Sequence, residues 1–136
     1  MPPFVLDASL AITWCFADEG TAYTHSILKA LDSTHAVVPA LWPFEVANAL
    51  VMAERRARIT EEGVEEFLAK LQRLPIYVER RESALLWRAI HRVAREHRLS
   101  GYDAAYLELA KREAMPLATL DDELKERCLA AGIQLA

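Results

Sequence analysis

The chain alternates short apolar runs with longer stretches in which apolar residues recur every three or four positions. The short runs predict strands at residues 4–7, 36–39, 76–80, 116–121 and 133–136, the first of them buried. The longer stretches predict helices at residues 9–16, 20–33, 41–57, 59–74, 83–97, 102–114 and 122–132. Strands that alternate with helices indicate an α/β fold with a mainly parallel sheet and helices on both of its faces.

Three helical stretches give specific expectations about burial. The helix over residues 41–57 is apolar nearly all round, which predicts that it is buried. In the helix over residues 20–33, the residues expected to face inward are Ala22, Ile27, Leu28 and Leu31. In the helix over residues 102–114, the apolar stripe consists of Tyr102, Ala105, Tyr106 and Leu109.

The composition fits an ordinary globular protein. The chain has 136 residues, 53% of them hydrophobic and 26% charged, which is enough for one domain spanning residues 1–136. The net charge of −4 argues against a protein that coats nucleic acid, but not against an enzyme that places metal ions between its carboxylates and a phosphate. Cys15 and Cys128 lie far apart and in no CxxC pattern, so we expect free thiols in a reducing cytoplasm. The apolar run near the start is too short to span a membrane.

Four carboxylates occupy unusual places in this pattern. Asp7 ends the first predicted strand, and Asp121 ends the strand over residues 116–121. In open α/β sheets the functional crevice lies beyond the carboxyl ends of the strands, where both of these acids belong. Glu45 is the only charged residue in an otherwise apolar stretch of its helix, and Asp103 stands at the start of another helix.

Each of these acids also has a purely structural interpretation. Asp7 can cap the helix that follows it, and either Asp121 or Asp122 can cap the last helix. Asp103 can form a capping box with the serine three residues before it, and Glu45 can pair with a buried arginine.

Considered together, the acids indicate a metal site. All four belong near the same end of the sheet, where clustered carboxylates raise one another's pKa. A hard divalent cation resolves this repulsion, and ligands that are all oxygen suit Mg²⁺ or Mn²⁺ rather than Zn²⁺.

The motifs that contain these acids are VLDAS (5–9), FEVANAL (44–50), LSGYDAAYLELA (99–110) and LATLDDEL (117–124). In this order, and over nearly the whole chain, the sequence resembles PIN-domain ribonucleases of the VapC toxin type. The resemblance implies a PIN-like three-layer α/β/α sandwich with a mainly parallel central sheet. It implies that the catalytic, metal-binding quartet consists of Asp7, Glu45, Asp103 and Asp121. The small polar residues that match the family's supporting positions are Ser9, Asn48 and Thr119.

The resemblance also implies a function. A protein of this type is a metal-dependent endoribonuclease that hydrolyses RNA phosphodiester bonds with a water activated by Mg²⁺ or Mn²⁺. It is the toxin of a type II toxin–antitoxin module in the cytoplasm, forms a homodimer, and is blocked by a VapB-type antitoxin. We expect Asp7 and Asp103 to be direct ligands, Glu45 to bind directly or through water, and Asp121 to complete a second, weaker metal position. Asp122 stays open as a helper of Asp121.

Two other classes of protein require residues that the chain lacks, and a third interpretation stays open. A phosphotransfer receiver domain needs an acidic pair near the first strand and a late lysine, which the chain lacks at the required places. A phosphatase of the haloacid dehalogenase type needs an aspartate at position 9, where the chain has Ser9. A catalytically silent PIN fold that only binds RNA or protein stays open.

Two surface features have more than one interpretation from sequence. The helix over residues 83–97 carries Arg88, Arg92 and Arg95 on one face, which fits either a phosphate-binding rim or a solvated face paired with glutamates. The helices between residues 20 and 72 offer an apolar groove to a partner.

Overall fold

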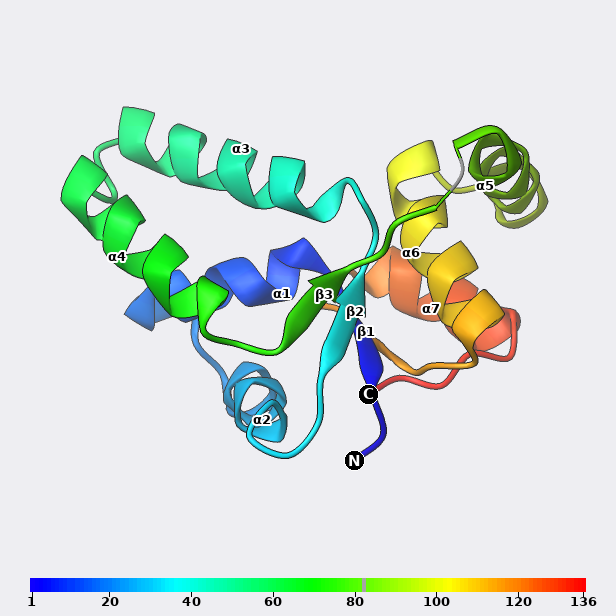
Figure 1. Ribbon diagram of the computed structural model, residues 1–136, viewed down its shortest axis with the longest axis horizontal. Helices are drawn as coiled ribbons and strands as arrows, with labels where there is room; N and C mark the ends of the chain where they lie inside the picture. The colour runs from blue at the N-terminus through cyan, green and yellow to red at the C-terminus, as the bar shows by residue number, and fades with distance from the viewer. Residues whose placement is uncertain (82) are drawn as a thin grey trace.

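The computed structural model describes residues 1–81 and 83–136, and these residues form a four-stranded, all-parallel sheet (Figure 1). The strands are β1 (Phe4–Leu6), β2 (Ala36–Val38), β3 (Ile76–Val78) and β4 (Leu117–Ala118), in the order β3-β2-β1-β4. Val5 of β1 pairs with Val37 on one side and with Leu117 on the other. All of β1 is buried, as expected for an interior strand of a parallel sheet.

Helices cover both faces of the sheet. The helices before β3 are α1 (Ala8–Ile12), α2 (Ala22–Ala30), α3 (Trp42–Arg55) and α4 (Glu61–Gln72), with two 3₁₀ turns, η1 (Thr13–Cys15) and η2 (Ala17–Glu19), between α1 and α2. The helices after β3 are α5 (Ser83–His97), α6 (Gly101–Glu113) and α7 (Asp122–Ala130). The first group lies on one side of the sheet and the second on the other (Figure 1). The predicted three-layer α/β/α sandwich is therefore confirmed.

Local sequence explains several of the helix ends. Thr60 caps α4 by accepting a hydrogen bond from the backbone N–H of Gly63 at 3.1 Å, as predicted. Pro43 occupies the first turn of α3, where its missing N–H costs nothing. Gly132 follows α7 with φ +82°, a left-handed conformation that favours glycine. Within the described residues, no helix combines the length and the apolar character needed to cross a bilayer.

The structure corrects four sequence-based expectations. Ala22 and Tyr102 are exposed instead of facing the core. Both belong to the first turn of a helix, where periodicity fixes the direction of a side chain but not the presence of a neighbour to pack against. Helix α3 is not buried all round, since Phe44 in its first turn is exposed. The strand expected at 133–136 is reduced to an isolated bridge between Leu117 and Leu135.

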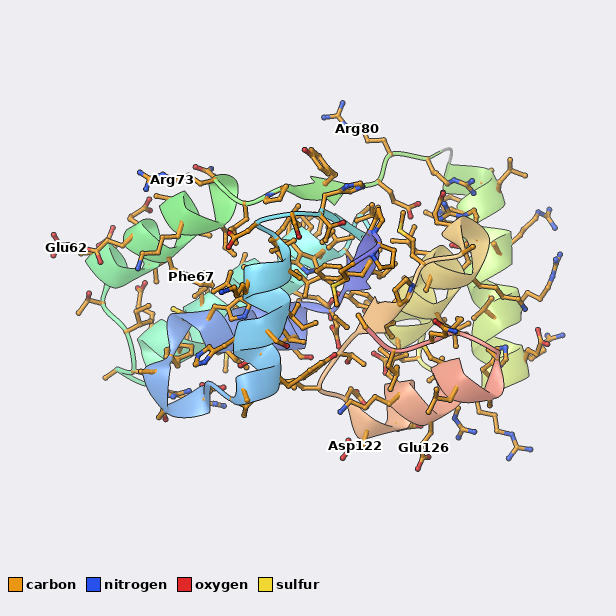
Figure 2. The ribbon with its side chains drawn as sticks, turned by 90° about the horizontal axis from the view of Figure 1, so that it is seen from below. Glu62, Phe67, Arg73, Arg80, Asp122 and Glu126 are labelled. Atoms are coloured by element: carbon orange, nitrogen blue, oxygen red, sulfur yellow. The ribbon has the colours of Figure 1, made fainter. Side chains whose placement is uncertain are left out.

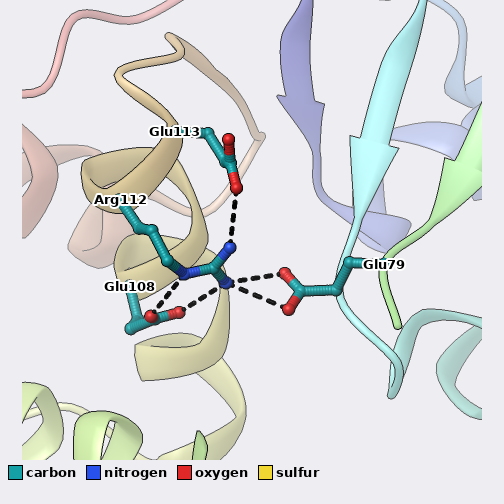
Figure 3. A network of polar contacts seen from close by, with 4 residues as sticks. All are labelled: Glu79, Glu108, Arg112 and Glu113. Atoms are coloured by element: carbon teal, nitrogen blue, oxygen red, sulfur yellow. Dashed lines mark hydrogen bonds and ion pairs between the residues drawn. The ribbon is translucent and has the colours of Figure 1, made fainter. Parts of the chain in front are cut away.

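An ion-pair network holds α6 against the end of β3 (Figure 3). The Arg112 guanidinium contacts two glutamates of its own helix α6, Glu108 and Glu113, each at 2.8 Å. It also contacts Glu79, the residue directly after β3, at 2.8 Å. The side chains of Arg112, Glu79 and Glu108 are 18%, 10% and 9% exposed, so water screens these charges only weakly. The network fixes the position of α6, which also carries Asp103.

Candidate active site

The candidate site lies at the point of the sheet where the strand order reverses, between β1 and β4. The chain leaves β1 for helices on one face and reaches β4 from helices on the other face, which makes the carboxyl ends of β1 and β4 a topological switch point. Asp7 directly follows β1, and Asp121 follows β4 after a short turn. Glu45 and Asp103 stand in the first turns of α3 and α6.

Asp7 is nearly buried, with 7% of its surface exposed, and two hydroxyl groups fix its carboxylate. Its Oδ2 atom accepts hydrogen bonds from Ser9 Oγ at 2.9 Å and from Thr119 Oγ1 at 2.6 Å. From the described residues, its Oδ1 atom accepts only a long bond of 3.4 Å from the Ser9 backbone, which makes Asp7 the cap of α1. Because both hydroxyls bind the same oxygen, Oδ1 keeps most of its capacity for a further ligand.

Thr119 joins two of the acids. Its buried hydroxyl donates to Asp7 and accepts a hydrogen bond of 3.0 Å from the backbone N–H of Asp121. Asp121 in turn caps α7, since its Oδ1 atom accepts from the backbone N–H of Leu124 at 3.1 Å. Oδ2 of Asp121 accepts no hydrogen bond from the described residues, so the capping role leaves one oxygen for another partner.

Asp122, the neighbour of Asp121, is placed differently. Its side chain is 96% exposed and lies 3.7 Å from the Lys125 ammonium on the surface of α7. Figure 2 shows Asp122 and Glu126 pointing outward from this helix. Within the described part of the chain, the ion-pair partner of Asp122 is therefore Lys125 and not a group of the candidate site.

Glu45 has a tyrosine, not an arginine, as its partner. The Tyr106 hydroxyl donates to Glu45 Oε1 at 2.5 Å and accepts a hydrogen bond of 3.2 Å from the backbone N–H of Ala8. This buried hydroxyl thereby connects α6, α3 and α1. Burial and the charges of Asp7 and Glu45 raise the pKa of Tyr106, so the phenol stays protonated and acts as a donor. The sequence analysis placed Tyr106 in the core stripe and gave its hydroxyl no partner, although a phenol in an apolar stripe signals a buried polar partner.

Asp103 is the least occupied of the four acids. The Ser100 hydroxyl accepts a hydrogen bond of 3.1 Å from the Asp103 backbone N–H, which forms one half of the expected capping box. The Asp103 carboxylate forms no hydrogen bond with the described residues. Burial raises the pKa of Asp103, and the charges of Asp121 and Asp7 raise it further.

The electrostatics show that the carboxylates act on one another. Burial raises the pKa of Glu45, the hydrogen bond from Tyr106 lowers it, and the charges of Asp7 and Asp103 raise it again. Cys128 of α7, a buried free thiol, has its pKa raised to about 12 by burial and by the same two aspartates. Among the described residues, no lysine, arginine or histidine forms an ion pair with any of the four acids.

The donor set fits a hard divalent cation. All four acids offer carboxylate oxygens, and each has at least one oxygen with spare capacity. In the conformation described, no three of the described His, Cys, Asp or Glu side chains lie close enough together to enclose an ion. Protein-bound Mg²⁺ commonly takes only one or two carboxylates and keeps several of its waters.

Of the three small polar residues expected to support the acids, two contact Asp7 and one does not. Ser9 and Thr119 bind Asp7, as described above, whereas Asn48 is exposed and its side chain forms no hydrogen bond within the described part of the chain. On α5, Arg88, Arg92 and Arg95 form what we call the α5 stripe and border a hollow of about 250 Å³ together with His91. The described residues supply no ion pair to this stripe, so the expected pairing with glutamates is not present there.

An apolar groove lies on the other side of the molecule from the α5 stripe. It has a volume of about 470 Å³ and runs between α3 and α4, and we call it the α3–α4 groove. Residues that line it include Trp42, Val46 and Leu50 from α3 and Val64, Leu68 and Leu71 from α4. Its apolar lining is the kind of surface that accepts a partner helix.

Comparisons with known proteins identify the fold family. The PIN domain family model matches residues 4–128. The structure of PAE2754 from Pyrobaculum aerophilum is similar with a TM-score of 0.65 and 23% identity, covering 93% of this chain and 87% of that one. FitAcB from Neisseria gonorrhoeae has a TM-score of 0.63 and 15% identity, covering 99% of this chain and 96% of that one. VapBC2 from Rickettsia felis, solved with a DNA fragment from its promoter, has a TM-score of 0.67 and 10% identity, covering 100% and 98%.

At these identities the solved structures establish a shared fold. The search of curated proteins found no significant match. The family model, in contrast, spans nearly all of the elements described above, from β1 to α7. The chain therefore belongs to the PIN domain family.

Proposed function

We propose that this protein is a metal-dependent endoribonuclease and the toxin of a type II toxin–antitoxin module. PIN domains are generally nucleases that use divalent metal ions. The observation that carries the proposal is the placement of four acids at the switch point without a basic partner among the described residues: Asp7, Glu45, Asp103 and Asp121. The charges of neighbouring acids raise the pKa of Glu45 and of Asp103, which is costly for the fold and would be offset by a cation that binds there.

The residues that would hold Mg²⁺ or Mn²⁺ follow from their free oxygens. Asp7 and Asp103 would bind directly, while Glu45 and Asp121 would complete the site directly or through water. When bound, the cation activates a water for attack on phosphorus and stabilises charge on the leaving oxygen.

The surrounding hydroxyl groups act as positioning groups. Ser9 and Thr119 bind one oxygen of Asp7, and Tyr106 binds one oxygen of Glu45. These hydrogen bonds would fix the orientation of each carboxylate and leave its second oxygen for the cation. The raised pKa values of Glu45 and Asp103 mean that cleavage will decline as the pH falls, because protonated acids do not bind the cation.

The proposed partner is a VapB-type antitoxin, and the α3–α4 groove is its proposed binding site. Two structural relatives, VapBC2 and FitAB, were solved with DNA fragments. The groove supports a helical segment as occupant, because apolar residues from two splayed helices line it. The variant Val51→Glu places a charge in this groove and is expected to abolish neutralisation by a co-expressed VapB-type antitoxin. The matched control is Leu129→Glu on α7, which is also exposed but lies outside the groove.

Cleavage of RNA by purified protein tests the nuclease directly. Wild type is expected to cleave single-stranded RNA with Mg²⁺ or Mn²⁺ and to stop with a chelator. Asp7→Asn is expected to be inactive, whereas Asp122→Asn, which changes an exposed acid directly after the cap of α7, is expected to keep full activity. Cleavage by Asp7→Asn at the wild-type rate would contradict the proposal and favour the alternative, a PIN fold that only binds RNA or protein.

Metal binding is tested separately by thermal unfolding. At a hundredfold excess over its Kd, a cation that binds only the folded protein adds about 2.7 kcal/mol to the free energy of unfolding. This gain is expected for wild type and not for Asp7→Asn.

A further inference from the structure

Two aromatic side chains stand exposed beside the acids. Phe44 directly precedes Glu45 in the first turn of α3, and Tyr102 directly precedes Asp103 in the first turn of α6. They are 78% and 69% exposed, and Phe44 is the most exposed large apolar side chain among the described residues. Single exposed apolar residues are ordinary, but here two come from separate helices and stand next to two acids of one cluster.

Both rings belong to the helix ends that carry the acids. In an α-helix each Cα–Cβ bond tilts toward the N-terminus, so a side chain in the first turn leans past the helix end. For α3 and α6 this end is the one that carries Glu45 and Asp103. Consecutive helical residues point about 100° apart, so the rings flank the acids and do not cover them.

The fold itself does not account for these two rings. Tyr102 makes no side-chain hydrogen bond with the described residues, and neither ring forms an aromatic or cation–π pair there. The ring of Tyr106, four residues along α6, is fully buried by contrast. An exposed ring gains its full stabilisation only when a partner surface covers it.

We propose that Phe44 and Tyr102 are stacking platforms for unpaired RNA bases, and that they hold the nucleotides which flank the phosphate to be cleaved. This inference rests on the proposed nuclease function. The net charge of −4 and the acidic cluster give an RNA phosphate little attraction at the site itself. Stacking on an aromatic face supplies affinity that does not depend on charge and is open to any base.

The proposal specifies single-stranded RNA as the substrate class. Bases in a duplex are already stacked on one another and cannot be covered by a protein ring. Two platforms on different helices would splay the bases apart and leave the phosphate between them facing the acids. Tyr102 and Phe44 are therefore positioning residues, and their rings, not the Tyr102 hydroxyl, carry the role.

RNA binding by an inactive background tests the proposal. In Asp7→Asn protein, the affinity for a fluorescently labelled, unstructured RNA oligonucleotide is measured by anisotropy with Mg²⁺ present. Phe44→Ala and Tyr102→Ala are each expected to raise the Kd about 5- to 150-fold, the loss typical of one stacked base. The matched control is Tyr77→Ala, which removes a ring that is 59% exposed on β3 and is expected to leave the Kd unchanged.

Three further readouts separate stacking from a structural role. The affinity for the same sequence as a duplex is expected to stay unchanged in both alanine variants. The slope of log affinity against log salt is expected to stay unchanged, because no phosphate contact is lost. Tyr102→Phe and Phe44→Trp keep a ring and are expected to bind single strands as tightly as the background.

The other outcomes overturn the proposal in distinguishable ways. If wild type neither cleaves nor binds RNA, the proposed function fails and the platforms fail with it. If the protein cleaves RNA but both alanine variants bind like Tyr77→Ala, the nuclease stands and the platforms are refuted. If Phe44→Ala and Tyr102→Ala convert a dimer to a monomer in sedimentation, the two rings form an interface between copies of the chain instead.

Discussion

The variant Thr119→Val isolates the hydroxyl group that joins two acids of the candidate site. Valine has nearly the shape of threonine and favours the extended backbone at the end of β4. The change removes the 2.6 Å bond to Asp7 Oδ2 and leaves the backbone N–H of Asp121 without its 3.0 Å acceptor. Asp7 then keeps only the hydroxyl of Ser9 on the same oxygen.

The expected loss of stability follows from these two bonds. A hydrogen bond to a charged group contributes about 1.5–3 kcal/mol, and an unsatisfied, half-buried N–H costs about 1 kcal/mol more. Valine avoids burying a hydroxyl, which offsets about 1 kcal/mol. We therefore expect the free energy of unfolding to fall by about 1.5–3 kcal/mol. For a chain of 136 residues this lowers the Tm by about 5–10 °C.

The assay compares three proteins by thermal unfolding and by titration with Mg²⁺. Thr119→Ser keeps the hydroxyl but loses one buried methyl group, so its free energy of unfolding is expected to fall by only about 1 kcal/mol. Thr119→Val is also expected to bind Mg²⁺ about 10- to 100-fold more weakly, because Asp7 loses a group that orients it. If the valine variant is as stable as the serine variant and binds Mg²⁺ like wild type, the bridging role of Thr119 is refuted.

Three other predictions concern charge. Burial and neighbouring acids raise the pKa of Asp103, so the folded protein loses stability as the pH rises above 3.8, the ordinary pKa of an aspartate. Asp103→Asn is therefore expected to raise the Tm at pH 7 without divalent ions and to change the Tm little at pH 3. Arg112→Met leaves the buried Glu108 without its countercharge and is expected to lower the free energy of unfolding by about 3–5 kcal/mol in urea denaturation. Replacing the α5 stripe by three glutamines is expected to reduce the salt slope of single-stranded RNA binding by about 2.

Each of these has a matched control. Asp122→Asn changes an exposed acid and is expected to leave the Tm unchanged at both pH values, so an equal gain in both variants would contradict the account of Asp103. Arg127→Met removes an exposed pair with Glu123 at 4.0 Å and is expected to cost less than about 1 kcal/mol. A similar cost for Arg112→Met would show that its network contributes little. An unchanged salt slope in the triple variant would remove the α5 stripe from the RNA surface.

Sequence patterns predicted the layers and elements of the fold because they depend on local signals. The runs that became β1 to β4 are apolar and short, and Thr60, Pro43 and Gly132 mark helix ends by local chemistry. The last predicted strand survives only as a bridge to Leu117, since a short apolar segment does not specify how many residues will pair.

The contacts inside the site were harder to predict because they join remote parts of the chain. Glu45 and Tyr106 are 61 residues apart, and no local pattern states that a phenol will meet that carboxylate. Asp7 and Asp121 turned out to be helix caps, as their structural interpretation required, yet each retains an oxygen beyond its capping bond. Capping and metal binding were weighed as alternatives, but the two carboxylate oxygens make them compatible. The four acids as a functional site remain a prediction.

The pairing of β1 with β4 has a consequence for the order of events during protein synthesis. Asp7 and Thr119 are separated by 112 residues along the chain. At about 5–20 residues per second, the ribosome adds the second of these residues about 6–22 seconds after the first. Strands β1 and β2 can pair early, whereas Asp7 and Asp121 can come together only after β4 has been synthesised. The proposed site is therefore incomplete until the ribosome has passed Asp121, so shorter nascent chains are expected to lack the proposed nuclease activity.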